Sequence, residues 1–477
     1  MNMIENYLTK SIEKPQRHRL LHGYPYPNLM RSVNGSDQPS YLFDNLTIAH
    51  NKPVIIGVIP HTSCNPLIKG CGFCTFPHQS WNTERVRETV GNVSEEIKSF
   101  NKKHNAFHHT KVQSIYFGGG TANLTPKDQF ENLCQDLCNS FDCSDAEVTL
   151  EGVPKYFTLD NFRYLDILQR NFNAGKLRLS IGIQTLDEAL LQKMGRQNFG
   201  DKNCIRMLEK EAQTRGVGLS GDLLFNLPGQ TIEMMKSDIF ELYDLGFNQI
   251  SIYHLVMFRG LGPEWSKDPS ILSSLPDNKT ALENWLKLRE MLLSLGYEQR
   301  TLTNFQKKSD GNNFEYEECV FQPENFNWIG FGPSAISTFY DDNFNKGIKL
   351  LNPETASKYN ENSSPEKYFL FDEMDMKVLF ATRKIALLEI DKVLYNKLFN
   401  SNIELDFAEE IYSLSKAKLI SNLKDKIELT PMGMFFADTV AGVFSLRKAG
   451  ARRRFNLRQD HLFFSENSND GVDYPMG

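Results

Sequence analysis

Six short runs rich in β-branched residues alternate with longer segments of helical periodicity, and this alternation limits the folds open to the chain. In the longer segments, such as TERVRETVGNVSEEIKSFNKK, apolar residues recur at three- and four-residue spacing. Repeated strand–helix units imply a parallel sheet with covering helices, because parallel strands need a long crossover between them. The sequence therefore predicts an α/β fold whose sheet closes as a full or partial barrel. The strand-like runs are PVIIGVIP (53–60), VQSIYFGGG (112–120), AEVTLEGVP (146–154), KLRLSIGIQ (176–184), GLSGDLLFNLPG (218–229) and NQISIYHLVMF (248–258).

The amino-acid composition and charge indicate an ordered globular chain and argue against nucleic-acid and membrane partners. Of the 477 residues, 40% are hydrophobic and 23% are charged, which is typical of an ordered chain with a sizeable core. A net charge of −6 gives no overall field that would attract nucleic acid. The polar N-terminus lacks the apolar centre of a signal peptide, and no stretch of about 18 apolar residues predicts a membrane span. We expect a cytoplasmic protein that acts on a small molecule, with neither nucleic acid nor membrane as a partner.

The unusual residues of the predicted strands gather at the carboxyl ends of those strands. Cysteines follow the first run, Gly118–Gly120 follow the second, Glu151 lies in the third and Gln184 ends the fourth. In parallel α/β folds, ligands bind at this edge of the sheet. The sequence therefore predicts that the functional site lies there.

Three cysteines in the loop after the first strand form the pattern Cys-x6-Cys-x2-Cys, in SCNPLIKGCGFC. Three thiolates can hold three irons of a [4Fe–4S] cluster and leave the fourth iron open, whereas four cysteines would close the cluster. An open iron can chelate the amino and carboxylate groups of S-adenosylmethionine (SAM), whose reductive cleavage yields a 5′-deoxyadenosyl radical. The predicted metal ligands are Cys64, Cys71 and Cys74. A zinc site with His61 or His78 as fourth ligand is the alternative.

A second group of cysteines has similar spacing, but we predict that it packs in the core and binds no cluster. Cys134, Cys138 and Cys143 fall in or just after DQFENLCQDLCNSF, whose apolar residues have helical spacing. Thiols on one helix face pack as small hydrophobic groups, so we expect packing before an auxiliary cluster. Cys204 and Cys319 are isolated, and we interpret both as structural.

Seven segments, in order, make the chain resemble the oxygen-independent coproporphyrinogen III oxidase family of the radical SAM superfamily over roughly residues 50–445. This resemblance implies a partial (β/α)6 radical SAM barrel with an N-terminal extension and a small, mainly helical C-terminal domain. The expected divisions are 1–52 (N-terminal extension), 53–300 (barrel), 301–370 (extension completing the core), 371–450 (helical C-terminal domain) and 451–477 (tail). The segments are CGFC, YFGGGT (116–121), EGVP around Glu151, RLSIGIQTLDEALLQKMGR (178–196), DLLFNLPGQT (222–231), FQPENFNWIGFGPSAIS (321–337) and LTPMG (430–434).

The resemblance also implies a set of SAM-binding residues. Phe73 would lie near the adenine, and the backbone of three glycines would approach the SAM amino group. For Arg196 the alternative is a solvated arginine at a helix end. The implied SAM contacts are Phe73, Gly118, Gly119, Gly120, Glu151, Gln184, Arg196 and Asp222.

Members of this family can bind a second SAM beside the first. Phe321, Gln322 and Ile336 match the positions that line this second site, although Phe321 and Ile336 would serve equally well as core residues. Glu151 and Gln322 are the residues to which the resemblance assigns catalytic roles. An electron donor such as flavodoxin or ferredoxin is the expected protein partner.

The chain departs from the family around the site itself. Coproporphyrinogen oxidases have Cys-x3-Cys-x2-Cys and a further cysteine two residues later, where this chain has a gap of six and Phe76. A family tyrosine in the first strand is replaced within Val58–Pro60, and the family's N-terminal arginine–tyrosine segment is replaced by LLHGYPYPNL. These differences weaken the prediction of a porphyrinogen substrate more than the prediction of the cofactors.

Four functions follow, in this order of preference. The first is radical methyl or methylene transfer to a small molecule, by methylation or cyclopropanation, with a second SAM as the one-carbon donor. The second is oxidative decarboxylation of coproporphyrinogen III, whose carboxylates Arg452, Arg453 and Arg454 would bind if they were not simply solvated. The third is a haem-binding chaperone, although the His-Asn-x-x-Tyr-Trp segment of such proteins is absent. An RNA-modifying enzyme is the last, because no basic RNA-binding domain is evident.

Overall fold

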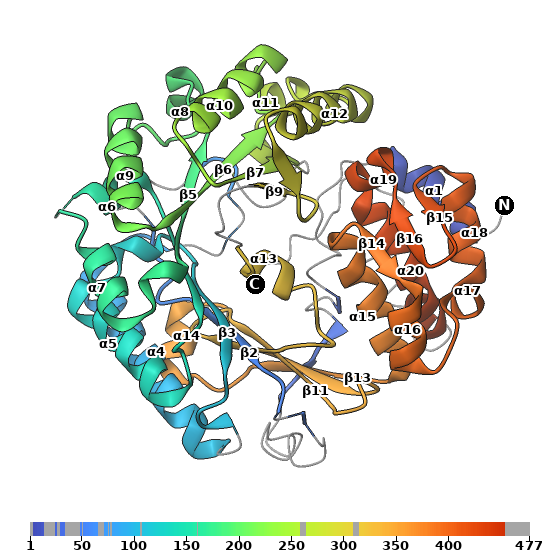
Figure 1. The fold of residues 1–477 in the computed structure, drawn as a ribbon, viewed down its shortest axis with the longest axis horizontal. Coiled ribbons are helices and arrows are strands. Elements are labelled where there is room, and N and C mark those ends of the chain that lie inside the picture. Colours follow the sequence, from blue (N-terminus) through green and yellow to red (C-terminus); the bar gives the residue numbers. More distant parts are fainter. Residues whose placement is uncertain are drawn as a thin grey trace.

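Six parallel strands form the centre of one large sheet, in the order in which they occur along the chain (Figure 1). Each strand lies next to its predecessor, and Glu151 of the third lies opposite Ser180 of the fourth. The prediction of a parallel α/β fold is confirmed, and each strand falls within its predicted run. The strands are β2 (Val54–Val58), β3 (Val112–Phe117), β4 (Glu147–Gly152), β5 (Leu177–Gln184), β6 (Gly218–Phe225) and β7 (Gln249–His254).

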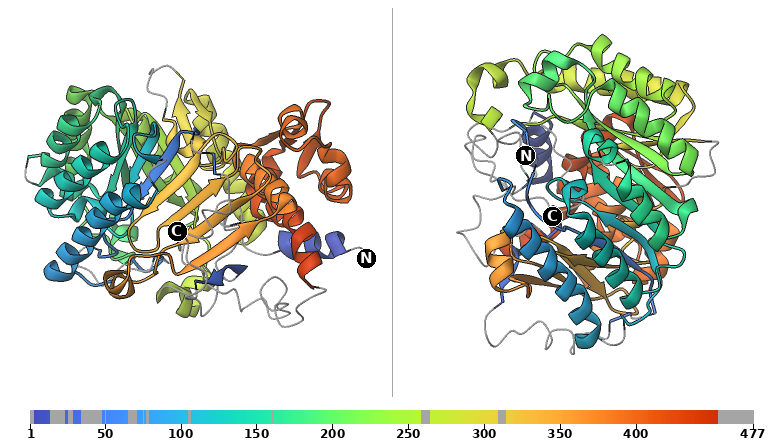
Figure 2. Two further views of the ribbon diagram at one scale, coloured as in Figure 1. Left: turned by 90° about the horizontal axis from the view of Figure 1, so that it is seen from below. Right: turned by 90° about the vertical axis from the view of Figure 1, so that its left-hand side faces the viewer.

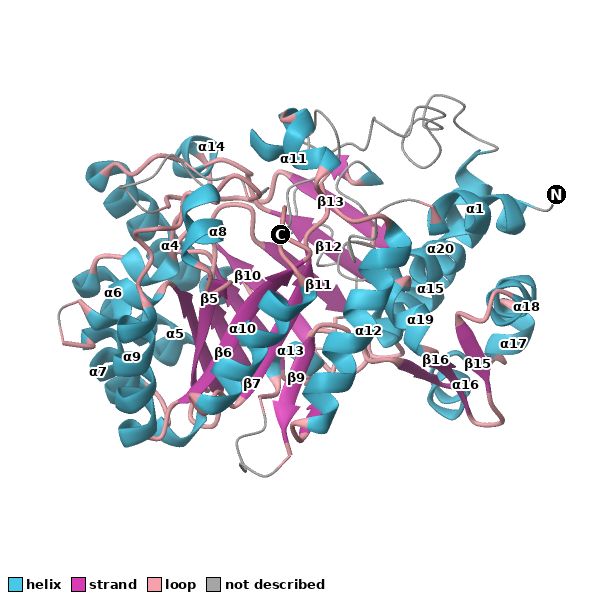
Figure 3. Cartoon of the chain, turned by 90° about the horizontal axis from the view of Figure 1, so that it is seen from above, coloured by secondary structure: helices cyan, strands magenta, loops and turns pink. Residues whose placement is uncertain are grey.

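The computed structural model describes most of the chain (Figure 3, residues not in grey). The described residues are 3–13, 24–25, 29–33, 48–49, 51–64, 71–74, 76, 79–104, 107–159, 161–257, 264–308 and 314–453. The predicted tail after residue 453, His78 and most of LLHGYPYPNL lie outside them.

Amphipathic helices connect successive parallel strands and cover the outer face of the sheet (Figure 1). Helix α4, for example, begins after Asn82, whose side chain accepts a hydrogen bond from the Arg85 N–H and so satisfies one free helix donor. The covering helices are α4 (Thr83–Lys103), α5 (Lys127–Ser140), α6 (Pro154–Thr158), α7 (Arg163–Asn171), α8 (Glu188–Lys193), α9 (Lys202–Arg215) and α10 (Ile232–Asp244). Helices α11 (Pro269–Ser273) and α12 (Asn278–Ser294) follow β7.

The sheet continues on both sides of the parallel core and remains open. Strand β10 (Asn327–Phe331) is parallel to β2, and Asn327 pairs with Val54. Beyond β10 lie the antiparallel strands β11 (Ile336–Tyr340), β12 (Gly347–Leu351), β13 (Lys367–Phe371) and β1 (Arg31–Ser32). The other side ends with β9 (Asn304–Lys307) and β8 (Tyr297–Gln299). In the described residues β1 and β8 are the two edges, so the barrel is partial, as predicted.

A short helix, α13 (Tyr316–Cys319), lies inside the curve of the sheet, against the amino ends of the strands (Figure 1). Its first turn is held by the Glu147 carboxylate, which accepts hydrogen bonds from the backbone N–H groups of residues 315 and 316. The buried Arg178 guanidinium forms an ion pair with Glu317 and hydrogen bonds to Thr149 Oγ1 at 2.9 Å. Helix α13 therefore closes the barrel at the amino ends of its strands, although its residues follow the barrel strands in sequence.

The C-terminal region is mainly helical and lies to one side of the sheet (Figure 2, orange and red). It contains a three-stranded antiparallel sheet and one long helix, α20 (Ala437–Arg453), against which the N-terminal helix α1 (Met3–Ile12) packs. Its other elements are α15 (Glu373–Ala386), α16 (Lys392–Phe399), α17 (Ile403–Asp406), α18 (Ala408–Lys416), α19 (Pro431–Phe435), β14 (Glu389–Asp391), β15 (Ile420–Asn422) and β16 (Lys426–Leu429); α14 (Ala356–Glu361) lies against α4. The predicted helical C-terminal region is confirmed. Within the described residues, no helix is both long and apolar enough to cross a lipid bilayer.

Candidate active site

The cysteine segment begins at the carboxyl end of β2 and is fixed to the sheet by backbone hydrogen bonds. The Gln79 N–H donates to the Thr62 carbonyl at 3.0 Å, and the Cys64 N–H donates to the Gln79 carbonyl at 3.3 Å. The Cys74 N–H donates to the Cys71 carbonyl at 3.1 Å, which forms a tight turn around Gly72. The three predicted ligands thus lie at the edge of the sheet where the sequence predicts the site.

The three thiols form an electrostatically coupled group. Burial raises the pKa of Cys64 to about 12, and the neighbouring Cys74 and Cys71 raise it further. Burial likewise raises the pKa values of Cys71 and Cys74, against the lowering effect of the Arg196 guanidinium. Thiolates next to one another in a buried site need a cation, so the donor set fits a cluster of iron and sulfide.

The described side chains do not form a site for a single metal ion. Among the described residues, no three His, Cys, Asp or Glu side chains are placed closely enough to hold one metal ion. Of the two alternative zinc ligands, His61 is buried against Trp81, with ring centroids 5.8 Å apart, and burial lowers its pKa to about 4. In a [4Fe–4S] cluster each thiolate binds a different iron, so the three cysteines need not converge on a single metal ion.

The glycine loop after β3 lies directly against the segment that leads to the cysteines. A Cβ atom on Gly120 would be 2.5 Å from the Ser63 carbonyl oxygen, and one on Gly119 would be 2.8 Å from Ile59 Cγ2. Gly119 also has φ +117°, a conformation that side chains disfavour. Only glycine lets the two loops approach this closely, so this segment leaves backbone rather than side chains at the site.

Glu151 and Asp222 lie half-buried on the inner face of the sheet, next to hydrogen-bond donors. The Tyr116 hydroxyl donates to Glu151 Oε2 at 3.3 Å, and the Ser180 hydroxyl donates to Asp222 Oδ2 at 2.9 Å. Burial raises the pKa of Glu151 to about 7, with the nearby Asp222 adding to the shift, and burial raises the pKa of Asp222 to about 6. A cationic or hydroxyl-bearing ligand would stabilise both carboxylates in their ionised form.

Arg196 is not a solvated helix-end residue. Its side chain is only 6% exposed, and its guanidinium donates to the Gly182 carbonyl at 2.5 Å and to Cys71 Sγ at 3.3 Å. The Phe199 ring stacks beneath it at 3.9 Å. Gln184 has φ +69°, and its amide lies over Gly182, since a Cβ there would be 3.1 Å from Gln184 Nε2. Arg196 and Gln184 therefore meet above one glycine, beside the cysteine segment.

Phe73 packs with residues from the neighbouring loops of the same edge. Its ring lies 6.2 Å from that of Trp265, and it contacts a small apolar cluster that includes Met194 and Leu227. The structure thus surrounds Phe73 with flat and flexible apolar side chains, as a site for a planar ring requires.

The three residues predicted to line a second SAM site differ in burial and in their contacts. Phe321 is buried in the main core, and Gln322 accepts a hydrogen bond from Asn325 Nδ2 at 2.9 Å. Ile336 is half-buried at the start of β11, with its backbone close above Gly330. The second SAM site stays a prediction.

Aromatic residues on the inner face of the sheet were not among the predicted site residues. Tyr116 stacks on Tyr316 of α13, with ring centroids 4.6 Å apart, and Trp328 lies edge-on to Tyr316 at 6.0 Å. Tyr253 is 40% exposed, and partial burial, with a smaller contribution from Asp222, raises its pKa. Period-two alternation identifies Tyr116 and Tyr253 as inward-facing residues, whereas nothing in the sequence brings Tyr316 back into the barrel.

Comparison with known proteins agrees with this arrangement. Residues 59–242 match the model of the radical SAM superfamily, a range that contains the cysteines, the glycine loop and the SAM-binding candidates. A heme chaperone HemW from Lactococcus lactis is 23% identical over 383 residues, which cover 79% of this chain and 94% of that protein. An oxygen-independent coproporphyrinogen III oxidase from Synechocystis is 24% identical over 352 residues, which cover 70% of this chain and 73% of that protein.

The fold agrees with that of one solved structure over nearly the whole chain. Coproporphyrinogen III oxidase from Escherichia coli, described as a radical SAM enzyme, superposes with a TM-score of 0.69 at 18% identity, over 91% of this chain and 99% of that one. The family match over residues 59–242 and the relatives above confirm the predicted resemblance: the chain carries a radical SAM domain and is similar in sequence to oxygen-independent coproporphyrinogen III oxidases.

Proposed function

We propose that this chain is a radical SAM enzyme in which Cys64, Cys71 and Cys74 hold a [4Fe–4S] cluster. When bound, the cluster would supply the electron that cleaves SAM to a 5′-deoxyadenosyl radical. The observation that carries the proposal is the contact between Arg196 and Cys71, because it joins the SAM-binding candidates to the cysteine segment at one edge of the sheet. A small electron carrier such as flavodoxin or ferredoxin would deliver the electron.

Different residues of the site would bind different parts of SAM. Arg196, with Gln184 beside it, presents a cation suited to a carboxylate, and the glycine loop presents backbone to an amino group. Asp222 and Glu151 offer carboxylates to the ribose hydroxyls and to the positive sulfonium. The apolar surroundings of Phe73 suit the adenine ring. These assignments rest on the family resemblance and on where the structure places each side chain.

For the reaction, we rank oxidative decarboxylation of a tetrapyrrole propionate ahead of methyl transfer, which reverses the order that sequence alone favours. The relatives that match over most of the chain are named as a coproporphyrinogen oxidase and a heme chaperone. A propionate side chain would lose a hydrogen atom to the 5′-deoxyadenosyl radical, then carbon dioxide and one electron, which an external electron acceptor takes up, and would become a vinyl group. The inner face of the sheet, with Tyr116, Tyr316 and Trp328, offers flat surfaces for a pyrrole ring.

The test is anaerobic turnover of the reconstituted protein with SAM, a low-potential reductant and coproporphyrinogen III. Decarboxylation predicts 5′-deoxyadenosine, carbon dioxide and vinyl products, without S-adenosylhomocysteine. Methyl transfer predicts S-adenosylhomocysteine in addition, and deuterium from methyl-labelled SAM in the 5′-deoxyadenosine. A Cys71→Ala variant is the control for chemistry that does not need the cluster. Absence of 5′-deoxyadenosine from the fully loaded protein would contradict the proposal.

A haem-binding role is the second candidate, because the Lactococcus lactis heme chaperone aligns over 94% of its length. Titration with haemin, followed by the Soret absorbance, distinguishes this role from catalysis. A chaperone would bind haem stoichiometrically and leave the porphyrin unchanged. An enzyme acting on coproporphyrinogen would convert its substrate whether or not haem is present.

A further inference from the structure

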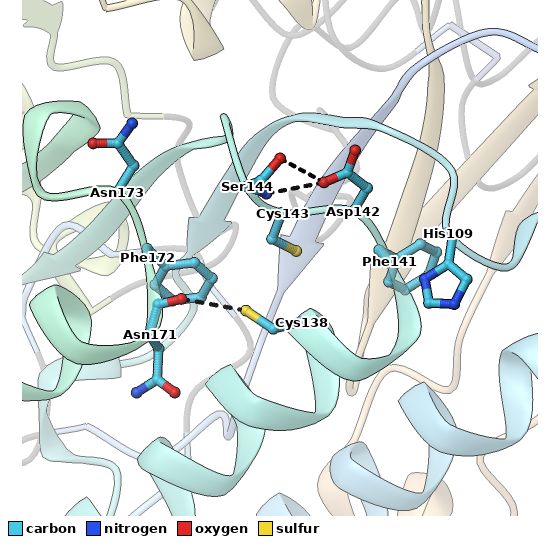
Figure 4. A pocket seen from close by; sticks show the side chains of 9 residues that line it. All are labelled: His109, Cys138, Phe141, Asp142, Cys143, Ser144, Asn171, Phe172 and Asn173. Carbon is cyan, nitrogen blue, oxygen red and sulfur yellow. Dashed lines mark hydrogen bonds between the residues drawn. The ribbon is translucent and has the colours of Figure 1, made fainter.

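An open pocket of about 540 Å3 lies at the other end of the sheet from the cysteine segment, where α5 ends and β4 begins (Figure 4). None of the residues assigned to SAM contributes to it. Two cysteines reach this pocket from different positions: Cys138 from the last turn of α5 and Cys143 from the loop before β4. The lining residues are His109, Cys138, Phe141, Asp142, Cys143, Ser144, Asn171, Phe172 and Asn173.

The two thiols differ in accessibility. Cys138 is half-buried and donates a hydrogen bond to the Asn171 carbonyl at 3.5 Å, whereas Cys143 is 5% exposed. Both thiols line the same pocket (Figure 4). The interaction with Cys143 lowers the pKa of Cys138, whereas the same interaction and burial raise the pKa of Cys143. The accessible sulfur is therefore the better nucleophile, and the buried sulfur lies behind it.

The loop that carries Cys143 is held in place by its own hydrogen bonds. The Asp142 carboxylate accepts from the Ser144 N–H at 3.2 Å and from the Ser144 hydroxyl at 2.6 Å (Figure 4). The Asp142 N–H donates to the Thr110 carbonyl at 3.1 Å, and the Val112 N–H donates to the Asp142 carbonyl at 2.9 Å. Cys143 is thus fixed relative to the sheet while Cys138 sits on the end of a helix.

We propose that Cys138 and Cys143 form a thiol–disulfide exchange site for low-molecular-weight disulfides of the glutathione type. The pocket is open and lined mainly by polar residues, so a small hydrophilic disulfide can reach the half-buried Cys138 sulfur. The proposal is independent of the proposed function, because no residue of the cysteine segment or of the SAM-binding set takes part.

The exchange proceeds in two balanced steps. The Cys138 thiolate attacks one sulfur of the disulfide RSSR, the S–S bond breaks, and RS⁻ leaves and takes a proton from water. Cys143 then loses its proton to water and attacks the Cys138 sulfur, which releases the second RS⁻. The net reaction converts two protein thiols and RSSR into one protein disulfide and two RSH, so two electrons pass from the protein to the small disulfide.

The test treats the anaerobically reconstituted protein with oxidised glutathione, blocks remaining thiols with iodoacetamide, and digests it with trypsin and an Asp-specific protease. Cleavage before Asp136, Asp142 and Asp145 separates Cys134, Cys138 and Cys143 into different peptides. Peptide 136–141 joined to peptide 142–144 is the expected product. Cys204, half-buried and without a second thiol among its described contacts, is the internal control and should retain glutathione as a mixed disulfide.

Two variants test the assigned order of attack. Cys143→Ser should accumulate glutathione on Cys138, because no second thiol can displace it. Cys138→Ser should leave Cys143 unmodified, since the buried sulfur is not reached from solvent. SAM cleavage by both variants should equal that of the unaltered protein, which also shows that they fold. The proposal is overturned if the unaltered protein retains glutathione on Cys138, or if both cysteines are recovered alkylated after oxidation.

Discussion

Arg196 donates a hydrogen bond from Nη1 to the Sγ of Cys71 at 3.3 Å, across 125 positions of sequence. The guanidinium is held beside this sulfur by its hydrogen bond from Nη2 to the Gly182 carbonyl and by the Phe199 ring stacked beneath it. One cation therefore serves both the cysteine segment and the proposed SAM site.

Replacing this arginine should make the cluster harder to reduce. A positive charge and a hydrogen bond at a ligand sulfur stabilise the reduced, more negative cluster, so Arg196→Met should lower its reduction potential. Redox titration monitored by electron paramagnetic resonance measures this potential. Arg170→Met removes an exposed ion pair with Glu131 and is the matched control, with no expected effect. An unchanged potential in Arg196→Met would show that the contact is lost when the cluster binds.

The two groups of cysteines should respond differently to substitution. Cys71→Ala should lower iron content and abolish formation of 5′-deoxyadenosine, because the cluster would lose one of its three ligands. Cys134→Ala should retain iron and activity, since Cys134 is fully buried in the core on α5. Iron and sulfide analysis after anaerobic reconstitution gives the result. Zinc in place of iron in the purified protein would favour the alternative site.

SAM affinity should depend on pH through Asp222. Burial raises the pKa of this carboxyl to about 6, so it is ionised above pH 6 and becomes protonated as the pH falls through that value. A protonated Asp222 is a weaker hydrogen-bond acceptor, so the affinity of the protein for SAM should decrease toward low pH. Asp222→Asn should weaken binding by roughly ten- to a hundredfold, the effect of about 1.5–3 kcal/mol, and should flatten the pH dependence near 6. Equilibrium dialysis with labelled SAM measures both, with iron content as the control.

The ion pair that fixes α13 should be important for stability. Arg178→Met leaves Glu317 without its partner in a buried site, which typically costs about 3–5 kcal/mol in the free energy of unfolding. Arg300→Met removes a partly exposed ion pair with Glu318 on the same helix and should cost less than about 1 kcal/mol. Denaturant unfolding of both variants provides the comparison. Equal losses would mean that α13 is not held mainly by Arg178.

Sequence alone predicted the parallel core because each of its strands is a short apolar run with helical segments on both sides. It also predicted α5 as the helix that carries Cys134 and Cys138, from the spacing of its apolar residues. It did not predict that α13 would return to the barrel or that β10 would pair with β2, since both contacts join distant segments without a local signal. The burial of Arg196 was equally hidden, because it depends on contacts with Gly182 and Cys71 that have no local signal in the sequence.

The pairing of β10 with β2 also has a consequence for folding of the chain during its synthesis. Strand β2 (Val54–Val58) has β3 on one side, but its other side is completed only by Asn327–Phe331. During synthesis at about 5–20 residues per second, the nascent chain would expose that strand edge for on the order of tens of seconds. Unpaired edges bind other strands readily. We therefore expect ribosome-bound intermediates of this protein to depend on chaperones until residue 331 has left the ribosomal exit tunnel.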